Sequence, residues 1–302
     1  MKNNILLLCL LFCFFSCEKE KKKETSIEKN VNDSSKVLIS EAIEIIDTTY
    51  SESNSIEDYC IALEHLKNEY TKKLNENNSS QKNNKLYEEY YSVRNKYIYN
   101  LSRANDTLLI NYVNQYNEEK EDFVLNGDYK KIANQLKKVA VEFWYVGESY
   151  TDFRSIPSHY PTMFKGKVSQ DYQDFLDQIA NDEKELYSSD GGFMVNFEEV
   201  GKRVDSWEQF LTKHPHSKLE KKAKKLYNNY LTDFIFGLEN TQTYVEAEGQ
   251  IDPVYMEVYD AFVKKHPNSK TTKKIQEFQK LVTKKTSLDN IQTALNLKYN
   301  FY

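Results

Sequence analysis

The sequence has little glycine and proline. Its 302 residues include 8 Gly and 5 Pro, against 23 Tyr and 16 Phe. Strand-rich folds need frequent turns, and turns are built mostly from Gly, Pro, Asn, Asp and Ser. The scarcity of Gly and Pro therefore argues against a β-rich fold. The many aromatic side chains supply large apolar areas for the core of a helical fold instead.

The sequence also lacks an apolar run long enough to span a membrane. Its most apolar run covers residues 5–15, whereas a transmembrane helix needs about 20 such residues. The net charge is −5, and basic residues are interleaved with acidic ones through most of the chain. Because no sustained basic stripe is present, nucleic acid is not expected as a partner.

Cysteine, histidine and catalytic motifs are equally scarce. Three of the four cysteines fall within the first seventeen residues, and the fourth, Cys60, lies on an apolar helical stripe. We expect Cys60 to be a small buried hydrophobe rather than a reactive thiol. The sequence contains no HExxH, GxSxG, P-loop or GxGxxG motif. It therefore predicts no catalytic residue, metal site or cofactor, although a site assembled from distant positions would escape such motifs.

The first seventeen residues have the layout of an export signal. Lys2 precedes the apolar run, and Ser16 places a small residue directly before Cys17. This arrangement resembles the lipobox of bacterial lipoprotein signal peptides, although Phe14 stands where that pattern prefers Leu and Phe15 where it prefers a smaller residue. The resemblance implies that residues 1–16 are cleaved off and that the thiol of Cys17 carries a covalent lipid. An ordinary secretory leader and an uncleaved anchor are the alternatives.

Residues 17–36 are rich in charge and lack apolar periodicity, which predicts a disordered tether. Stable membrane attachment needs more than one acyl chain, and a multiply acylated Cys17 would satisfy that need. The resemblance therefore implies a lipid-anchored protein of the bacterial cell envelope. Its expected place is the outer membrane, on the periplasmic or the surface face.

Apolar residues recur at helical spacing beyond residue 37. The sequence SIED at 55–58 is a capping box, which opens a helix. Further helices are expected at 86–101, 106–123, 129–146 and 168–186. We therefore predict an all-α fold, either a helical bundle or a short α-solenoid of αα-hairpins, behind the tether. It would have an N-terminal helical region over 37–146 and a C-terminal one over 167–302.

Residues 147–166 interrupt the helical pattern. The stretch GESYTDFRSIPSHYPTMFKG has two prolines, two glycines and no clear period. Long irregular loops are often functional. This one concentrates ionisable side chains: Glu148, Asp152, Arg154 and His159. We expect an irregular loop that would hold any small-ligand or catalytic site, with an ordered connector packed by its own aromatics as the alternative.

An internal repeat is the clearest signal in the body of the chain. WEQFLTKHPHSK at 207–218 matches YDAFVKKHPNSK at 259–270 in six of twelve positions. In each copy a proline is expected to end one helix and a serine to cap the next. Two αα-hairpins are therefore predicted, at about 197–237 and 253–284. The turn residues are His214, Pro215, Ser217, His266, Pro267 and Ser269.

The repeated turn resembles the turn of tetratricopeptide-like repeats in envelope lipoproteins. The offset of 52 residues departs from that family's period, which is about 34, and the family's Trp-Leu-Gly-Tyr signature is missing. His214 and His266 fall in separate hairpins, so we expect them near helix-end carbonyls rather than at a zinc ion.

Two functions are consistent with these features. The first is a lipid-anchored helical scaffold that binds another envelope protein or peptide, because stacked hairpins present extended surfaces. The alternative is an envelope small-molecule or glycan binding protein, or an enzyme, with its site in residues 147–166. A purely structural role in the envelope is a third reading.

Overall fold

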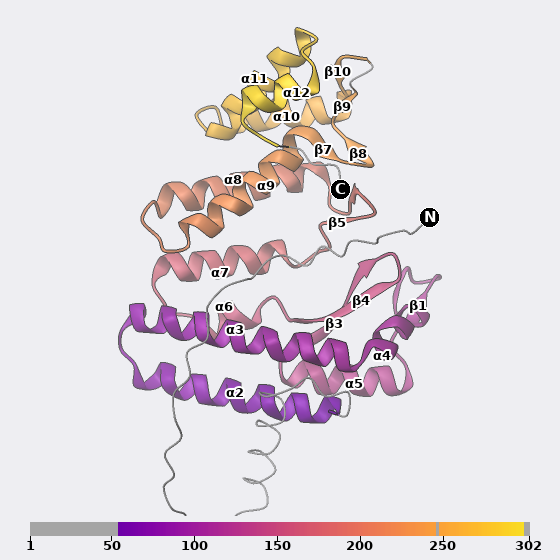
Figure 1. Ribbon diagram of the computed structural model, residues 1–302, viewed down its shortest axis with the longest axis vertical. Coiled ribbons are helices and arrows are strands. Elements are labelled where there is room, and N and C mark those ends of the chain that lie inside the picture. Colours follow the sequence, from indigo (N-terminus) through magenta and orange to yellow (C-terminus); the bar gives the residue numbers. More distant parts are fainter. Residues whose placement is uncertain (1–53, 246–247, 299–302) are drawn as a thin grey trace, which may run out of the picture.

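The computed structural model describes residues 54–245 and 248–298. Within these ranges the chain forms helical layers stacked along the long axis of the molecule, from the N-terminal helices to the C-terminal ones (Figure 1). The expected all-α fold is confirmed: the described residues form eleven α-helices, and their strands form five separate two-stranded sheets. The predicted signal peptide, the predicted tether and Cys17 lie outside the described residues.

The N-terminal layers are built on two long helices. The elements are α2 (Ile56–Glu76), α3 (Ser80–Ala104), α4 (Asp106–Ile110), a 3-10 helix η1 (Asn111–Gln115), β1 (Tyr116–Asn117), β2 (Asp122–Phe123) and α5 (Gly127–Lys138). The capping box is confirmed, because Ser55 Oγ accepts from the Asp58 N–H and the Asp58 carboxylate accepts from the Ser55 N–H. Cys60 is buried as expected, and burial raises the pKa of its thiol to about 11.

The single helix expected over 106–123 is wrong. The chain forms the short α4, then η1, and then a small hairpin of β1 and β2. Asn111, Asn114 and Asn117 punctuate this segment. Asn side chains bond to nearby backbone groups and so favour turns over helix interiors. The Asn117 side chain does this by accepting from the Lys120 N–H at 3.0 Å.

The helix expected over 129–146 is also wrong in its second half. Helix α5 ends at Lys138, and Val141–Gly147 forms strand β3. Ala140 has a φ of 55°, which ends the helix and redirects the chain. Val141 and Phe143 are buried while Glu142 and Trp144 are partly exposed, so the burial alternates with the period of a strand.

The irregular loop expected over 147–166 is mostly regular structure. Strand β4 (Tyr150–Ser155) pairs antiparallel with β3, and helix α6 (His159–Phe164) follows. The turn between the strands places Glu148 and Ser149 at positive φ, at 50° and 64°. Two positive φ values suit a two-residue hairpin turn, but Asn-Gly is the usual sequence for it. The hairpin packs on α3, where Arg94 donates to Ser155 Oγ at 3.0 Å.

The C-terminal layers contain the two repeated hairpins. The elements are α7 (Gln170–Asp182), β5 (Ser188–Ser189), β6 (Gly192–Phe193), α8 (Phe197–Lys213), α9 (Glu220–Phe236), β7 (Gly237–Leu238), β8 (Thr241–Gln242), β9 (Tyr244–Val245), β10 (Gln250–Ile251), α10 (Pro253–Lys265), α11 (Lys270–Thr283) and α12 (Leu288–Leu295). Helix pairs α8–α9 and α10–α11 coincide with the predicted hairpins. Gly237 ends α9 with a φ of 78°, where a Cβ would lie 2.1 Å from the carbonyl oxygen of Thr241.

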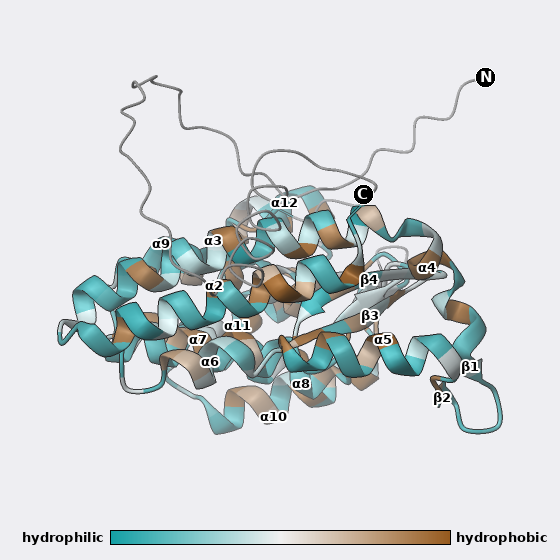
Figure 2. Cartoon of the chain, turned by 90° about the horizontal axis from the view of Figure 1, so that it is seen from below, coloured by the Kyte–Doolittle hydropathy of each residue, from teal (hydrophilic) through white to brown (hydrophobic). Residues whose placement is uncertain are grey.

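The layers are held together by a continuous core rich in aromatic side chains. Its largest fully buried members include Trp207, Tyr90, Tyr172 and Tyr259. Apolar segments alternate with hydrophilic ones along each helix (Figure 2), as expected for helices with one face in the core. Each layer therefore packs against its neighbour and leaves its polar side chains at the edges of the stack.

Candidate functional site

Of the four residues singled out in the expected loop, Asp152 and Arg154 line one cavity together, whereas Glu148 and His159 do not line it. Glu148 is exposed in the hairpin turn, and Asp152 is exposed on β4, where its carboxylate accepts from Ser102 Oγ. His159 is buried, and its Nε2 lies 2.7 Å from the Tyr90 hydroxyl. Burial lowers the pKa of His159 to about 3, so its ring is neutral at neutral pH. His159 therefore belongs to the packed interior.

Arg154 is the residue of this group with the most contacts. Its Nε donates to Glu142 Oε1 at 2.8 Å, and its Nη1 donates to the Glu183 carbonyl at 2.7 Å. The guanidinium also stacks on the Trp144 ring, 3.2 Å from the ring centroid, which adds a cation–π attraction. These contacts hold the Arg154 side chain in place. It lines two cavities and lies between them.

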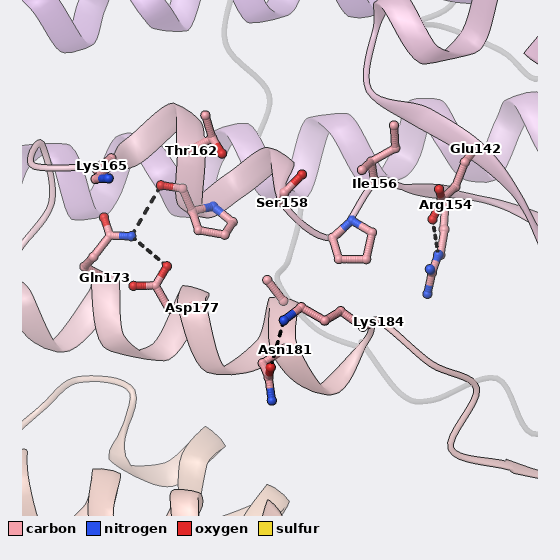
Figure 3. A pocket seen from close by; sticks show the side chains of 13 residues that line it. Glu142, Arg154, Ile156, Ser158, Thr162, Lys165, Gln173, Asp177, Asn181 and Lys184 are labelled. Atoms are coloured by element: carbon pink, nitrogen blue, oxygen red, sulfur yellow. Dashed lines mark hydrogen bonds and ion pairs between the residues drawn. The ribbon is translucent and has the colours of Figure 1, made fainter. Parts of the chain in front are cut away.

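The larger of these cavities has a volume of about 640 Å³ and lies between α6 and α7 (Figure 3). Thr162 lines its α6 side, and Gln173, Asp177 and Asn181 line its α7 side. Gln173 Nε2 donates to the Asp177 carboxylate at 3.1 Å, and Lys184 Nζ donates to Asn181 Oδ1 at 3.0 Å. The wall on α7 is therefore a row of polar side chains that are already paired with one another.

A second cavity of about 400 Å³ lies between α7, α8 and α10. Asn181 lines this cavity as well as the first, so the two adjoin across α7. Gly201, Val258 and Ala261 give it an apolar part. At Gly201 a Cβ would lie 3.0 Å from the ring of Phe234, so glycine permits the close approach of α8 and α9 here.

A third cavity of about 450 Å³ lies between α8 and the turn that follows α10. Asp205 and His266 line both the second and the third cavity. The three cavities therefore adjoin one another in a series along α6, α7, α8 and α10. We call this series the layer groove.

The layer groove carries both signs of charge. Its cationic side chains are Arg154, Lys165, Lys184, Lys202, Arg203, Lys213 and Lys265, and its carboxylates are Glu142, Asp177, Glu198, Glu199, Asp205 and Glu208. Several of these form pairs within the groove, such as Lys202 Nζ with Glu199 at 3.4 Å. The groove therefore offers no single-sign field that would select a highly charged ligand.

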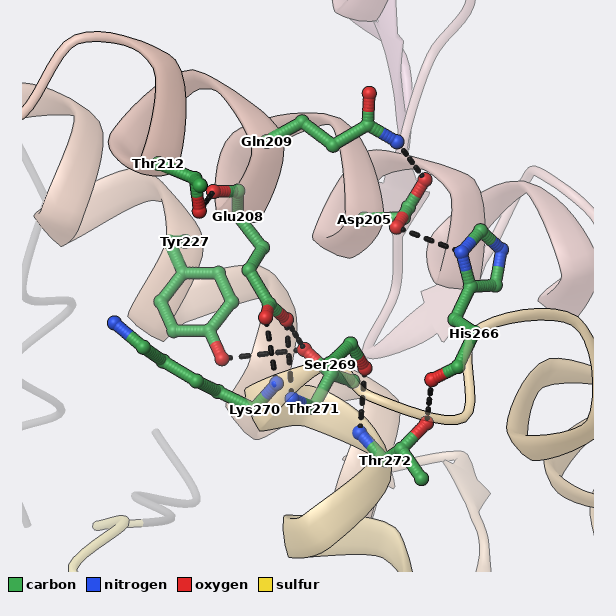
Figure 4. A network of polar contacts seen from close by, with 10 residues as sticks. All are labelled: Asp205, Glu208, Gln209, Thr212, Tyr227, His266, Ser269, Lys270, Thr271 and Thr272. Atoms are coloured by element: carbon green, nitrogen blue, oxygen red, sulfur yellow. Dashed lines mark hydrogen bonds and ion pairs between the residues drawn. The ribbon is translucent and has the colours of Figure 1, made fainter.

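The second repeated turn lines the third cavity, and its polar contacts are drawn in Figure 4. His266 Nδ1 lies 3.0 Å from the Asp205 carboxylate. The neighbouring Glu208 carboxylate accepts from the backbone N–H of Lys270 at 2.6 Å and from that of Thr271 at 3.0 Å. Ser269 caps α11 as predicted, because its Oγ accepts from the Thr272 N–H at 2.9 Å. Glu208 of α8 thus fixes the start of α11, and Asp205 of α8 contacts the histidine that ends α10.

The first repeated turn docks on α7 in a related way. His214 Nε2 lies 2.8 Å from the Asp174 carboxylate, and Ser217 Oγ donates to Asp171 at 2.5 Å. The prediction that Ser217 is the N-cap of α9 is wrong, because that helix begins after Leu219. Both histidines therefore face carboxylates of an adjacent helix rather than helix-end carbonyls.

Sequence reasoning missed the residues that build the layer groove. Asn181 and Ala261 carry no motif and lie far apart in the sequence. The one sequence feature that points to them is indirect. Asn181 is polar and Ala261 is small, and both lie on helices whose other faces are apolar. The repeated turn was found because its signal is local, yet its acidic partners on α7 and α8 were not.

The described residues contain no group of three or more His, Cys, Asp or Glu side chains that could hold a metal ion. The buried Asp182 accepts from Trp207 Nε1 at 2.8 Å and from Gln178 at 2.7 Å, and burial raises its pKa to about 6. These partners make Asp182 part of the α7–α8 contact. Its arrangement indicates a structural role and not acid–base chemistry.

Comparison with family models, with curated proteins and with solved structures finds no match to the chain. Across 54–245 and 248–298, no helix combines the length and the apolar character that crossing a membrane requires.

Proposed function

We propose that this protein is a lipid-anchored scaffold of the bacterial cell envelope that binds a segment of another envelope protein in the layer groove. The observation that carries the proposal is a series of three adjoining cavities across successive layers, in which neighbouring cavities share Asn181 or share Asp205 and His266 as lining residues. A small molecule would fill one cavity, whereas an extended chain can occupy a series of them. Helical arrays commonly offer such elongated surfaces to partner proteins.

The chemistry of the groove suits a polypeptide. A peptide presents backbone N–H and C=O groups together with side chains of both charges, and the groove lines its walls with amides, hydroxyls and both signs of charge. The apolar part at Val258 and Ala261 would accept one or two apolar side chains. Interfaces of this mixed type are usual for complexes that form and dissociate.

The lipid anchor completes the proposal. Acylation of Cys17 would place the helical body at the outer membrane, and residues 17–36 would give it reach as a flexible tether. The hairpins α8–α9 and α10–α11 support the tetratricopeptide-like part of the proposal, because each repeats a helix, a His-Pro-x-Ser-Lys turn and a second helix. No catalytic step and no cofactor besides the lipid on Cys17 is proposed.

Site-specific photo-crosslinking in native membranes tests the proposal. A photoreactive residue at Asn181 or Ala261 lies in the groove, and one at the exposed Gln276 of α11 serves as the control. We expect one discrete protein product at both groove positions and none at the control position. Ala261→Arg should abolish the product formed at Asn181, while Gln276→Arg should preserve it. A product at all three positions, or one that survives Ala261→Arg, would contradict the proposal.

A further inference from the structure

The second cavity that Arg154 lines differs in character from the layer groove. It has a volume of about 380 Å³ and lies between α3, the β3–β4 hairpin and α7. Arg154, Pro157 and Pro161 line both this cavity and the one between α6 and α7, so they form the ridge between them. Six of its lining residues are aromatic: Tyr87, Tyr91, Tyr99, Trp144, Phe153 and Tyr160. We call it the aromatic cleft.

The aromatic side of the cleft is a stripe on α3. Tyr87, Tyr91, Asn95 and Tyr99 follow one another at four-residue spacing, which places them on one helix face. Tyr91 is 41% exposed and Tyr99 is 56% exposed, although both have large apolar rings. The Tyr91 ring packs against Tyr160, with centroids 5.3 Å apart. The cleft therefore presents ordered aromatic surface to solvent.

Polar side chains line the cleft opposite and between the rings. Asp152 is positioned by two donors, Ser102 Oγ and the Phe153 N–H, and both bonds go to its Oδ1. Asn95 Oδ1 accepts from the Tyr160 hydroxyl at 3.1 Å. Glu183 also lines the cleft, close to Arg154. Carboxylate, amide and guanidinium groups are planar and can each bind two neighbouring ligand groups.

The aromatic rings and the polar side chains of the cleft together favour one class of ligand. An anionic ligand is disfavoured because two carboxylates line the cleft, and the cation Arg154 is already paired with Glu142. A purely apolar ligand is disfavoured because it would strip water from Asp152 and Asn95 without replacing those hydrogen bonds. A sugar ring meets both requirements, since its C–H face packs on aromatic rings while its hydroxyls bond to polar groups around the edge.

We propose that the aromatic cleft binds a neutral saccharide. Tyr91 and Tyr99 supply the surface on which a sugar ring stacks, and Asp152 accepts hydrogen bonds from its hydroxyls. The volume of 380 Å³ lies near the lower end of the range of about 300–1,000 Å³ for ligand pockets, which suits a short saccharide. The inference does not depend on the layer groove or on its proposed protein partner.

Tryptophan fluorescence offers a direct measurement, because the chain has two tryptophans. Trp207 is fully buried, whereas Trp144 lines the cleft. The full chain would be titrated with cellobiose, maltose, N,N′-diacetylchitobiose and the acidic digalacturonate. We expect at least one neutral disaccharide to give a saturable change, with digalacturonate binding more weakly than that sugar.

Matched tyrosine variants locate the site. Tyr91→Ala and Tyr99→Ala remove exposed rings of the cleft, and Tyr150→Ala removes a 65% exposed ring at the start of β4, outside the cleft. Each cleft variant should weaken binding about tenfold or more, whereas Tyr150→Ala should leave it unchanged. No saturable binding of any neutral sugar up to about 10 mM would overturn the proposal. Equal losses in Tyr91→Ala and Tyr150→Ala, or tighter binding of digalacturonate, would also overturn it.

Discussion

His214 and His266 have the same backbone conformation, with φ of −125° and ψ of 56° in both. Each ends a helix, and its N–H donates to the carbonyl of a phenylalanine four residues earlier, at 2.9 Å from Phe210 and 2.8 Å from Phe262. Proline follows each histidine and disfavours helical geometry there. The six shared residues of the repeat therefore encode one local turn twice.

The two turns meet their acidic partners in opposite order. On α7, His214 faces Asp174 and the following serine faces the earlier Asp171. On α8, His266 faces Asp205, and the residues after the turn face the later Glu208. The helix before the first turn, α8, runs antiparallel to α7, on which that turn docks. The helix before the second turn, α10, runs parallel to α8, on which the second turn docks. The order of the two acids is therefore reversed. One turn sequence can thus dock on helices of either direction if two acids stand three residues apart.

Glu208 should be the most costly residue of this docking to remove. Its buried carboxylate accepts from two backbone N–H groups and from Thr271 Oγ at 2.7 Å. Glu208→Ala leaves these donors without partners, so we expect the free energy of unfolding to fall by about 2–3 kcal/mol. Urea unfolding of this variant against Glu277→Ala, an exposed site on α11, measures the difference. Equal stability of the two variants would show that the hydrogen bonds to Glu208 contribute nothing to the stability of the fold.

The sequence predicted the parts of the fold that depend on local signals. The capping box at Ser55 and the turns at His214 and His266 were recognised because a few adjacent residues determine each. The hairpin of β3 and β4 was missed because Val141 and Phe143 also fit a helical stripe. Its turn uses Glu148 and Ser149 at positive φ, which few residues other than Gly, Asn and Asp adopt.

The candidate sites depend on contacts that no local pattern contains. Asn181 lines two cavities only because α7 lies between α6 and α8 in the stack. Arg154 was named from the composition of its segment, and it does line two cavities, whereas Glu148 and His159 from the same segment line neither of these two. The composition of the segment therefore indicated the right region. The orientation of Arg154 depends on its pairing with Glu142, and that of His159 on its contact with Tyr90.

His159 should make the protein sensitive to acid. Burial holds the pKa of its ring at about 3, well below the ordinary value of 6.5, and Arg94 and Lys67 act in the same direction. The stability that the neutral ring contributes is complete above pH 6.5 and is lost as the pH falls toward 3. The slope approaches about 1.4 kcal/mol per pH unit. His159→Asn should flatten this part of the stability profile, and the exposed His65→Asn should not. Parallel profiles for wild type and His159→Asn would contradict the assignment.

Asp182 should have the opposite pH dependence. Burial raises its pKa from 3.8 to about 6, against the lowering effect of Trp207 and Arg203. The protonated acid is favoured in the fold, so stability is lost as the pH rises from about 4 to 6. Asp182→Asn keeps an acceptor for Trp207 and cannot ionise. Relative to wild type, it should gain up to about 3 kcal/mol over this interval. The surface variant Asp260→Asn should show no such gain in the same thermal-unfolding series. A difference in stability between Asp182→Asn and wild type that stays constant over this pH interval would rule the explanation out.

Cys17 should carry the lipid, and the structure supplies a matched control within the same chain. Metabolic labelling with palmitate should label the wild-type protein and leave Cys17→Ser unlabelled. Cys60→Ala should label like wild type, because Cys60 is buried on α2 and burial raises the pKa of its thiol to about 11. Such a thiol is neither accessible nor ionised at neutral pH, so it cannot account for labelling of the intact protein. Equal labelling of wild type and Cys17→Ser would contradict the lipobox, and loss of label in Cys60→Ala alone would move the modification to the helical body.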